Sequence, residues 1–332
     1  MPPYDWPKIE AAGYDYLVNK VRYAENFYDL FRIDHVVGTF RLWTIRRDEP
    51  SENHGLNGRF DPEDPALWEE HGRKILSVMI QNSGMLPCAE DLGVVPECSN
   101  RVLENFGVPG MDVQRWTRDW GATYDFKDPA AYRVNSAAVI SNHDMTSFAG
   151  WWRFEAGTVD GELFQRKCAE HGVDFAGVQE KIFDVGRSAH GRLRWKTEIR
   201  STWDLAAAIG KSENEIHGLA ALHRESRDEK EKFCRYLGLP EGEYEGGKLS
   251  RLIQGAFEKV CSAASVFSIQ LLQDLLLLEN TAAEDPWSFR INFPGTTGPQ
   301  NWTLAMPLSL EQITRLPING KILEIHRGAG RI

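Results

Sequence analysis

Three short apolar segments of this chain end in acidic residues, and this recurrence constrains its fold more than any other feature. The segments read FRIDHVVG, MLPCAEDLG and AAVISNHD, and their acids are Asp34, Glu90 and Asp144. Short apolar runs of this kind are typical of buried strands. A charge at the end of such a strand is costly unless it is paired or used. The sequence therefore indicates strands whose ends carry either ion pairs or residues of a functional site.

Helical segments alternate with these strands. Apolar residues at helical spacing predict a helix from about Trp6 to Tyr28, and Asp64 is the expected N-cap of a second helix that ends before Gly84. A third, short helix is expected over Pro96 to Phe106, closed by Gly107. Alternating strands and helices indicate an α/β fold of parallel units, in which polar residues gather at the carboxyl ends of the strands. Five strand candidates end near Asp34, Glu90, Arg115, Asp144 and Asp274.

The pattern divides the chain into three parts. Strands and helices alternate over residues 1–149, residues 150–262 read as helical and carry much of the charge, and residues 263–332 return to a strand followed by an irregular loop. We expect the middle part to be a helical insertion or subdomain.

Composition excludes several classes of protein. The formal net charge of −10 and the lack of any Lys/Arg cluster argue against a nucleic-acid partner. The five cysteines are scattered without a CxxC pair, which favours reduced cytosolic thiols over disulfides or a zinc site. The start, MPPYDWPKIE, lacks the features of a signal peptide, and the most apolar stretch, VFSIQLLQDLLLLE, is too short and polar to span a bilayer. We therefore expect a cytoplasmic protein without a membrane partner.

Three convergent carboxylates near an Arg and a His suggest chemistry at a developing positive centre. Glycosyl transfer is such a reaction, because one carboxylate attacks the anomeric carbon while another protonates the leaving oxygen. The alternative is a structural role, in which each acid caps a helix or forms a salt bridge. The pattern by itself does not decide between the catalytic and the structural role.

The three segments also resemble a known family. FRIDHVVG, CAEDLG and SNHD are similar to signature segments of the 4-alpha-glucanotransferases of glycoside hydrolase family 77, within the alpha-amylase clan. PPYDWPKIEAAGYDYL and FRINFPGTTGPQNW resemble further family segments near the two ends. The resemblance implies a partial (β/α)8 TIM-type barrel, with strands 4 to 7 in residues 1–149 and the last strand in 263–332. It also implies an alpha-glucan substrate, a retaining mechanism, no cofactor and no metal, and leaves the oligomeric state open.

Catalytic roles follow from the resemblance, position by position. Asp34 corresponds to the nucleophile, with Arg32 two residues earlier holding its carboxylate ionised. Glu90 corresponds to the general acid and base, and we expect the neighbouring Asp91 to raise its pKa. Asp144 corresponds to the residue that stabilises the transition state.

Sugar-binding roles follow from the same resemblance. His143 would hydrogen-bond the reacting sugar, although a capping or core histidine is the alternative. His35 would contact the sugar or support Asp34. Trp43, Asn301 and Trp302 are expected to line the groove, although tryptophans are more often core residues.

Some features depart from the family. Val36 and Val37 replace its usual Phe-Arg, Met145 to Ser147 replace its Asn-Asp-Thr, and the resemblance places the first three barrel strands before Met1. A truncated or degenerate, non-catalytic glucan-binding member is therefore the alternative. A metal-dependent hydrolase using His35 and His143 is disfavoured, because no HxH or three-ligand pattern is present.

Overall fold

The computed structural model describes residues 3–53, 55–240, 249–279 and 285–332. The backbone packs into two compact units. The first unit comprises Met1–Asp112, Arg133–Ala137 and Ser265–Phe267, and the second comprises Val113–Tyr132, Ala138–Ala264 and Ser268–Ile332. Each unit is described by itself.

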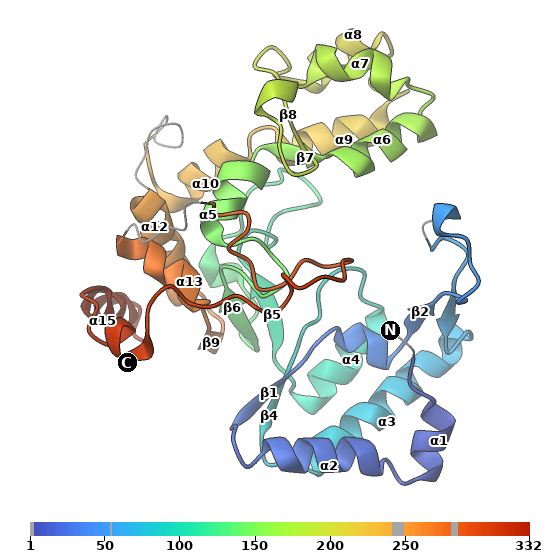
Figure 1. The fold of residues 1–332 in the computed structure, drawn as a ribbon, viewed down its shortest axis with the longest axis vertical. Helices are drawn as coiled ribbons and strands as arrows, with labels where there is room; N and C mark the ends of the chain where they lie inside the picture. Colours follow the sequence, from blue (N-terminus) through green and yellow to red (C-terminus); the bar gives the residue numbers. More distant parts are fainter. Residues whose placement is uncertain (1–2, 54, 241–248, 280–284) are drawn as a thin grey trace. The chain divides into compact units, whose positions relative to one another are not determined.

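The first unit alternates helices with short strands, as the sequence predicts (Figure 1). The elements up to the end of this alternation are α1 (Trp6–Ala11), α2 (Asp15–Ala24), β1 (Leu30–Ile33), η1 (Val36–Thr39), β2 (Leu42–Thr44), η2 (Ser51–Asn53), β3 (Arg59–Asp61), η3 (Pro65–Leu67), α3 (Trp68–Gln81), β4 (Leu86–Ala89), α4 (Glu97–Phe106) and β5 (Gly110–Val113).

The predicted helices form with small changes in their ends. Tyr14 adopts a left-handed conformation and separates α1 from α2, so the first predicted helix is two. Asp64 caps the short η3, which leads into α3. Gly107 closes α4 in the left-handed conformation, where glycine carries no Cβ penalty.

Strands β1 and β4 pair in parallel, with Leu30 opposite Leu86 and Ile33 opposite Ala89. The pairing continues beyond the strands, because Glu90 donates its backbone N–H to the oxygen of Ile33 at 2.9 Å. Helix α3 lies beside α2 and α4 (Figure 1). The apolar faces of β1, η1, α3, β4 and α4 meet in one core, whose buried members are Ile33, Val36, Val37, Phe40, Leu76, Ala89, Val102, Leu103 and Val108. This packing brings the residues that follow β1 and β4 to the same end of the pair.

The second unit is mainly helical. Its elements, including those at the boundary, are η4 (Pro129–Ala131), β6 (Ser136–Val139), α5 (Phe148–Gly150), the π-helical turn η5 (Trp151–Glu155), β7 (Thr158–Asp160), α6 (Gly161–Glu170), α7 (Phe175–Ile182), η6 (Val185–Arg187), β8 (Arg192–Arg194), α8 (Thr202–Ile209), α9 (His217–Ser226), α10 (Glu229–Leu237), α12 (Leu249–Cys261), β9 (Phe267–Ser268), α13 (Leu272–Leu275), η7 (Leu276–Glu279), α14 (Leu310–Ile313) and α15 (Ile318–Gly328).

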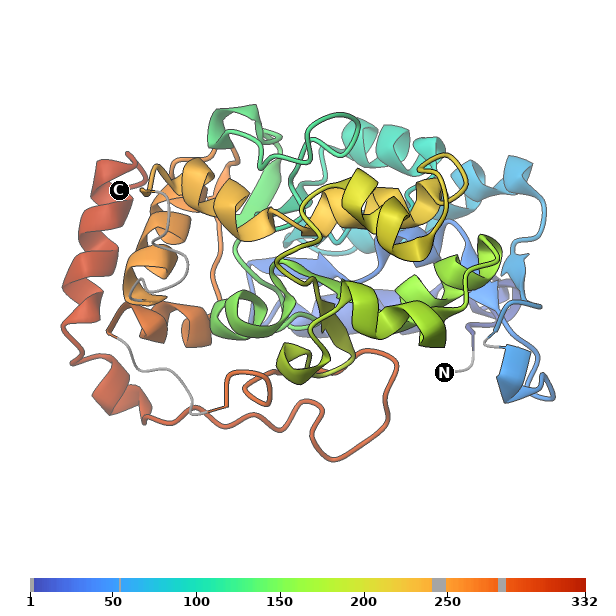
Figure 2. The same ribbon diagram turned by 90° about the horizontal axis from the view of Figure 1, so that it is seen from above.

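Two hydrophobic cores support this unit. One forms where α12 packs beside α10 and α15 (Figure 2), and Phe148, Trp151 and Phe233 belong to it. The other lies among α6, α7, α8 and α9, with Phe164, Phe183 and Trp195 in edge or tilted ring contacts. The antiparallel pair β7–β8 belongs to the second core, so the predicted helical stretch also contains strands.

The prediction of a strand ending near Asp274 is wrong. Strand β9 covers only Phe267–Ser268, and Asp274 lies in helix α13. The reason is the side chain of Gln270, whose Oε1 accepts the N–H of Ile140 at 2.9 Å while its Nε2 donates to the oxygen of Ala138 at 3.1 Å. The N–H of Ile269 still donates to the oxygen of Ala138 at 3.2 Å, but after it the Gln270 side chain takes the place of the backbone ladder, and the chain turns into a helix at Leu272.

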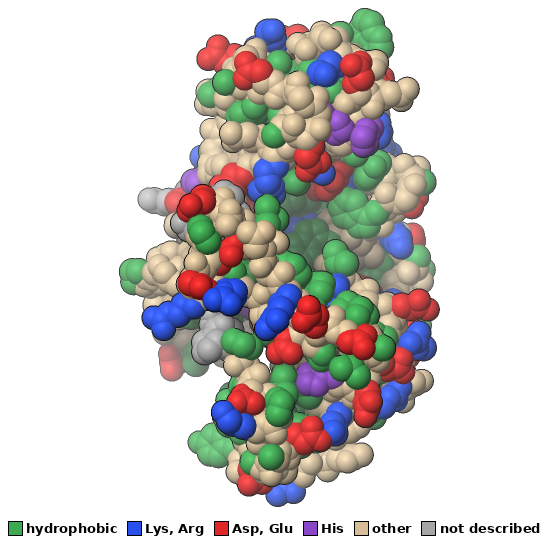
Figure 3. Space-filling view, turned by 90° about the vertical axis from the view of Figure 1, so that its right-hand side faces the viewer, with side chains coloured by type: hydrophobic (Ala, Val, Ile, Leu, Met, Phe, Trp, Pro, Cys, Tyr) green, Lys and Arg blue, Asp and Glu red, His purple; other side chains and the backbone are tan. Residues whose placement is uncertain are grey.

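One face of the molecule is mixed in charge. On the face seen in Figure 3, acidic and basic side chains are interspersed and do not form a basic patch. Within the described residues, no helix is both long and apolar enough to cross a membrane.

Candidate active site

The end of β1 carries an ion pair. The guanidinium of Arg32 donates from Nε at 3.1 Å and from Nη2 at 2.5 Å to one oxygen, Oδ1, of Asp34. The Arg32 side chain is 24% exposed, whereas that of Asp34 is 59% exposed. The pair has the two-residue spacing that puts side chains on one side of a strand. The Asp34 carboxylate is thus oriented by a mostly buried cation and is more than half exposed.

His35 joins the ends of β1 and β4 through its backbone. It adopts a left-handed conformation with φ of 48°, which is uncommon for a residue with a Cβ. In this conformation its N–H donates to Oε2 of Glu90 at 2.8 Å. The N–H of Leu92 donates to Oε1 of Glu90 at 3.2 Å. The carboxyl group of Glu90 is thus fixed by two backbone donors, one of them directly after Asp34.

Burial raises the pKa of Glu90 above the ordinary value of a glutamate, and the negative charge of Asp34 acts in the same direction. The two backbone donors and the positive charge of Arg32 oppose this rise without cancelling it. The predicted direction is therefore confirmed. The predicted cause is wrong, because Asp91 turns to other partners: it forms an ion pair with Arg133 and accepts the N–H of Met111 at 2.9 Å.

In the second unit, Asp144 lies in an irregular segment that follows β6. Its Oδ1 accepts a hydrogen bond from Nδ2 of Asn292 at 2.7 Å, and Nε2 of His143 lies 3.3 Å from its Oδ2. Arg290 donates from Nη2 to the backbone oxygen of Asp144 at 2.9 Å. The Asp144 side chain is 37% exposed, so its carboxylate remains accessible.

The irregular loop from Arg290 to Trp302 supports this second group. The N–H of Asn292 donates to the oxygen of His143 at 3.1 Å, and the N–H of Trp302 donates to the oxygen of Ile291 at 2.7 Å. The Trp302 ring is 65% exposed, and its centre lies 5.0 Å from that of His143. An exposed ring next to a histidine and a carboxylate is suited to stacking on a sugar.

Two of the predicted groove residues have structural contacts of their own. The amide of Asn301 holds the loop, since its Oδ1 accepts the N–H of Phe293 at 2.8 Å and its Nδ2 donates to the oxygen of Thr296 at 3.1 Å. Trp43 donates from Nε1 to the oxygen of Gly55 at 2.9 Å and packs edge-on against Phe60 across β2 and β3. Sugar contacts by Trp43 and Asn301 stay predictions.

Asn292 and Arg290 were not singled out from the sequence as site residues. Both belong to the quoted segment FRINFPGTTGPQNW, which carried the family resemblance. The sequence feature that could have identified them is the polar pair Arg290 and Asn292 in an otherwise apolar stretch directly before Pro294 and Gly295.

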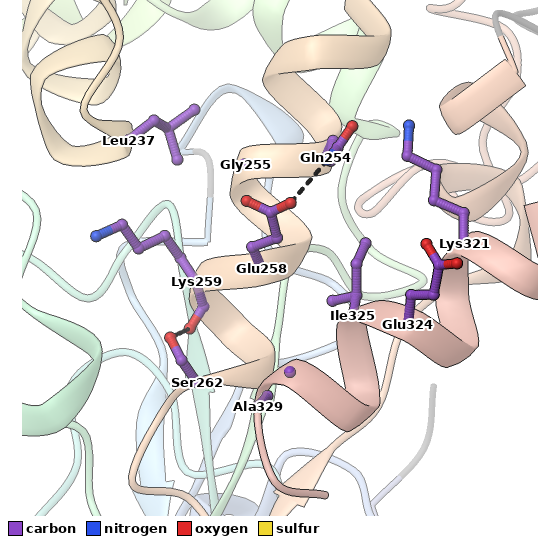
Figure 4. Close-up of a pocket in the computed structure, with 11 residues that line it drawn as sticks. Leu237, Gln254, Gly255, Glu258, Lys259, Ser262, Lys321, Glu324, Ile325 and Ala329 are labelled. Atoms are coloured by element: carbon purple, nitrogen blue, oxygen red, sulfur yellow. Dashed lines mark hydrogen bonds between the residues drawn. The ribbon is translucent and has the colours of Figure 1, made fainter.

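Metal-ligating groups and pockets are the other places where a functional site could lie. Within either unit taken alone, the described residues form no group of three or more metal-ligating side chains. A pocket of about 570 Å³ lies between α12 and α15, where acidic and basic groups such as Glu258, Lys259, Lys321 and Glu324 alternate (Figure 4). None of the predicted site residues lines that pocket. The predicted catalytic residues thus form the Arg32–Asp34–Glu90 group in the first unit and the Asp144–His143–Asn292 group in the second.

Solved structures with a similar fold are amylomaltases. One is an amylomaltase from Streptococcus agalactiae in complex with acarbose, which matches with a TM-score of 0.55 and 19% identity, over 99% of this chain and 47% of that one. Another is an amylomaltase from Corynebacterium glutamicum, with a TM-score of 0.57 and 18% identity, over 96% of this chain and 38% of that one. The chain thus has an α/β fold similar to that of amylomaltases.

Sequence comparison makes the assignment specific. The family model described as 4-alpha-glucanotransferase matches residues 1–310. A 4-alpha-glucanotransferase from Chlamydia caviae is 37% identical over 327 residues, covering 98% of this chain and 46% of the relative. One from Chlamydia muridarum is 27% identical over 315 residues, covering 95% and 44%. The chain belongs to the 4-alpha-glucanotransferase family, as its three motifs predict, and spans less than half the length of these relatives.

Proposed function

We propose that this chain carries the catalytic residues of a 4-alpha-glucanotransferase, which moves alpha-1,4-glucan units between maltooligosaccharides. Family membership supports the reaction class. The observation that carries the proposal is the contrast between two carboxyl groups at the ends of paired strands. Asp34 is held by a cation, whereas Glu90 is buried and has a raised pKa. Retaining glycosyl transfer requires one ionised nucleophile and one protonated acid, and these environments favour that division.

The proposed mechanism is a double displacement without a cofactor. Asp34 attacks the anomeric carbon while Glu90 gives its proton to the leaving glycosidic oxygen, so that a covalent glycosyl-enzyme forms. Glu90, now a carboxylate, takes the proton of an acceptor 4-hydroxyl as that oxygen attacks the same carbon. Two inversions retain the configuration. Arg32 orients the Asp34 carboxylate for its attack through two hydrogen bonds.

We propose that Asp144 acts on the same glucosyl unit, stabilising the positive charge that develops at its ring. Its contact with Asn292 supports this role, because a neutral donor orients the carboxylate without cancelling its charge. His143 would donate to a hydroxyl of this sugar, and Trp302 would stack on the neighbouring one. His35 acts mainly through its backbone, since its N–H binds Glu90. The acarbose complex of the amylomaltase from Streptococcus agalactiae is compatible with such a glucan site.

The finer fold assignment is also a proposal. Residues 1–149 would provide strands 4 to 7 of a (β/α)8 barrel, residues 150–262 a mainly helical insertion, and residues 263–332 the last strand and the carboxyl-terminal segment. The parallel pair β1–β4 with its connecting helix α3 supports this assignment. The last strand would then be the short β9. We propose a cytoplasmic location, which is supported by the five cysteines being free thiols.

Incubation with maltotriose tests the activity. The purified chain should convert it into a ladder of longer and shorter maltooligosaccharides plus glucose, and Asp34→Asn should abolish the ladder. Asp29→Asn is the matched control, because this exposed residue immediately precedes β1 and its part in the pairing is a backbone contact. A chelator should leave the ladder unchanged. Glucose release without longer products would identify a hydrolase instead, and maltotriose binding without turnover would favour the non-catalytic alternative.

A further inference from the structure

A single buried carboxylate is bonded to both ends of the segment that carries His143 and Asp144. Asp274 in α13 is completely buried. Its Oδ2 accepts the hydroxyl of Ser141 at 2.6 Å, and its Oδ1 accepts the backbone N–H of Phe148 at 2.7 Å. Ser141 is the first residue of this segment, residues 141–147, and Phe148 directly follows it.

Arg115 binds the same segment at two points. Its Nη2 donates to the hydroxyl of Ser141 at 2.8 Å and to the backbone oxygen of Thr146 at 3.1 Å, and its Nη1 donates to the hydroxyl of Thr146 at 3.2 Å. Arg115 is only 4% exposed, and its guanidinium lies over the ring of Trp151. The hydrogen-bond network extends beyond Thr146, because the Thr146 hydroxyl donates to Glu155 at 2.8 Å.

The hydroxyl of Ser141 links the two charged groups. It donates its hydrogen to Asp274 and accepts one from Arg115, so its orientation is fully determined. Charge-assisted bonds between buried groups are stronger than bonds at the surface. Burial raises the pKa of Asp274, while the Ser141 hydroxyl, the Phe148 N–H and the charge of Arg115 favour its carboxylate. The Asp274 carboxylate therefore keeps both of these hydrogen-bond partners only while the segment keeps its conformation.

The segment needs such support because it has no regular structure of its own. Residues 141–147 form neither helix nor strand, with a turn at His143 and Asp144. No ladder of backbone bonds fixes the direction of the Asp144 side chain. Asn292 and Arg290 hold Asp144 from the irregular loop, whereas Asp274 and Arg115 hold the ends of its segment from the buried side.

We propose that Asp274, acting with Arg115 through Ser141, is a positioning residue that fixes Asp144 in its reactive orientation. The inference rests on the proposed function, in which Asp144 stabilises the transition state. It adds two buried residues, far from Asp144 in sequence, that control the same step without touching substrate.

A double-mutant cycle tests coupling between Asp274 and Asp144. Fluoride release from α-maltosyl fluoride is the assay, because this activated donor keeps slow variants measurable. Asp274→Asn should lower kcat by on the order of 10²-fold in the wild-type background, as expected for a displaced catalytic group, with little change in KM. In the Asp144→Asn background the same change should have almost no further effect. Equal factors in both backgrounds would overturn the proposal, because Asp274 would then act independently of Asp144.

Glu229→Gln is the matched control. Glu229 is likewise a buried carboxylate that accepts a backbone N–H, that of Gly157 at 3.0 Å, and its ion pair with Arg118 lies outside the Asp144 segment. This variant should lower the stability of the fold but leave kcat close to wild type in both backgrounds. A fall in kcat as large as that of Asp274→Asn would reduce the effect of Asp274 to general destabilisation.

Two further measurements keep the test decisive. Ser141→Ala removes only the linking hydroxyl and can enter the same cycle if Asp274→Asn does not fold. Hydrogen exchange of residues 142–148 should speed up in Asp274→Asn and remain at the wild-type rate in Glu229→Gln. Wild-type protein that neither forms a ladder nor releases fluoride would refute the proposed function, while the exchange result would still decide whether Asp274 holds the segment. Unchanged exchange in Asp274→Asn would overturn its positioning role in either case.

Discussion

Replacing Gly72 by alanine probes the packing that supports the turn after Asp34. Gly72 is buried in α3, and a methyl group added there would overlap the ring of Phe40. Phe40 is completely buried and directly follows η1, which begins just after His35. The change therefore pushes on the segment whose backbone holds Glu90.

Two opposing contributions determine how much Gly72→Ala changes the free energy of unfolding. Alanine is favoured over glycine inside a helix by about 1 kcal/mol. Overpacking a rigid core costs about 1–3 kcal/mol, because the ring must leave its rotamer or the backbone must shift. Gly320→Ala in α15 is the control, since an added methyl group meets no atom within 4 Å. We expect Gly72→Ala to be less stable than Gly320→Ala by about 1–3 kcal/mol, which is the overpacking contribution alone.

Native-state hydrogen exchange measures this difference locally. Amides of α3 and α15 report the opening free energy of each helix separately, so that the two units are not confused. The double variant Gly72→Ala/Phe40→Leu should recover part of the loss, because a smaller side chain makes room for the methyl group. The reasoning would be refuted if Gly72→Ala stabilised α3 as much as Gly320→Ala stabilises α15, or if the Phe40 change gave no recovery.

Four further predictions concern the two carboxylate groups and one helix. The basic limb of kcat/KM should lie above the ordinary pKa of a glutamate, because burial raises the pKa of Glu90 and the acid must be protonated. Arg32→Met should move this limb further up, since the Arg32 charge lowers that pKa; a downward move would contradict the assignment. Asn292→Ala should lower kcat/KM by roughly 10- to 100-fold, the loss of one hydrogen bond to a charged group, with maltotriose transfer as the assay. Ser201→Ala should destabilise α8 by about 1 kcal/mol in hydrogen exchange, because Ser201 and Asp204 form a capping box there.

Local sequence signals predict much of the first unit. Strands β1 and β4 are short apolar runs, and α4 ends at Gly107 as its sequence indicates. The contact between Arg32 and Asp34 also follows from local spacing, because alternate residues of a strand share a side. These features depend on neighbours in the chain, so a pattern of a few residues is sufficient to find them.

Features that depend on distant residues could not be predicted. The Gln270 side chain accepts the N–H of Ile140 in place of a backbone ladder bond, and the expected strand gives way to helix α13. Asn292 binds Asp144 from a loop 148 residues away. The pKa of Glu90 rises through burial, which is a property of the whole packed surroundings and not of the adjacent Asp91.

The central claim is that Asp34 is the nucleophile, and trapping the glycosyl-enzyme tests it most directly. A 5-fluoro-α-maltosyl fluoride should accumulate the covalent intermediate, because its ring fluorine slows breakdown while the fluoride leaving group permits formation. After trypsin digestion, the account predicts that the added mass lies on the peptide of residues 33–41, at Asp34, and is absent in Asp34→Asn. Label on the peptide that carries Glu90 or Asp144, or steady fluoride release without any label, would contradict it.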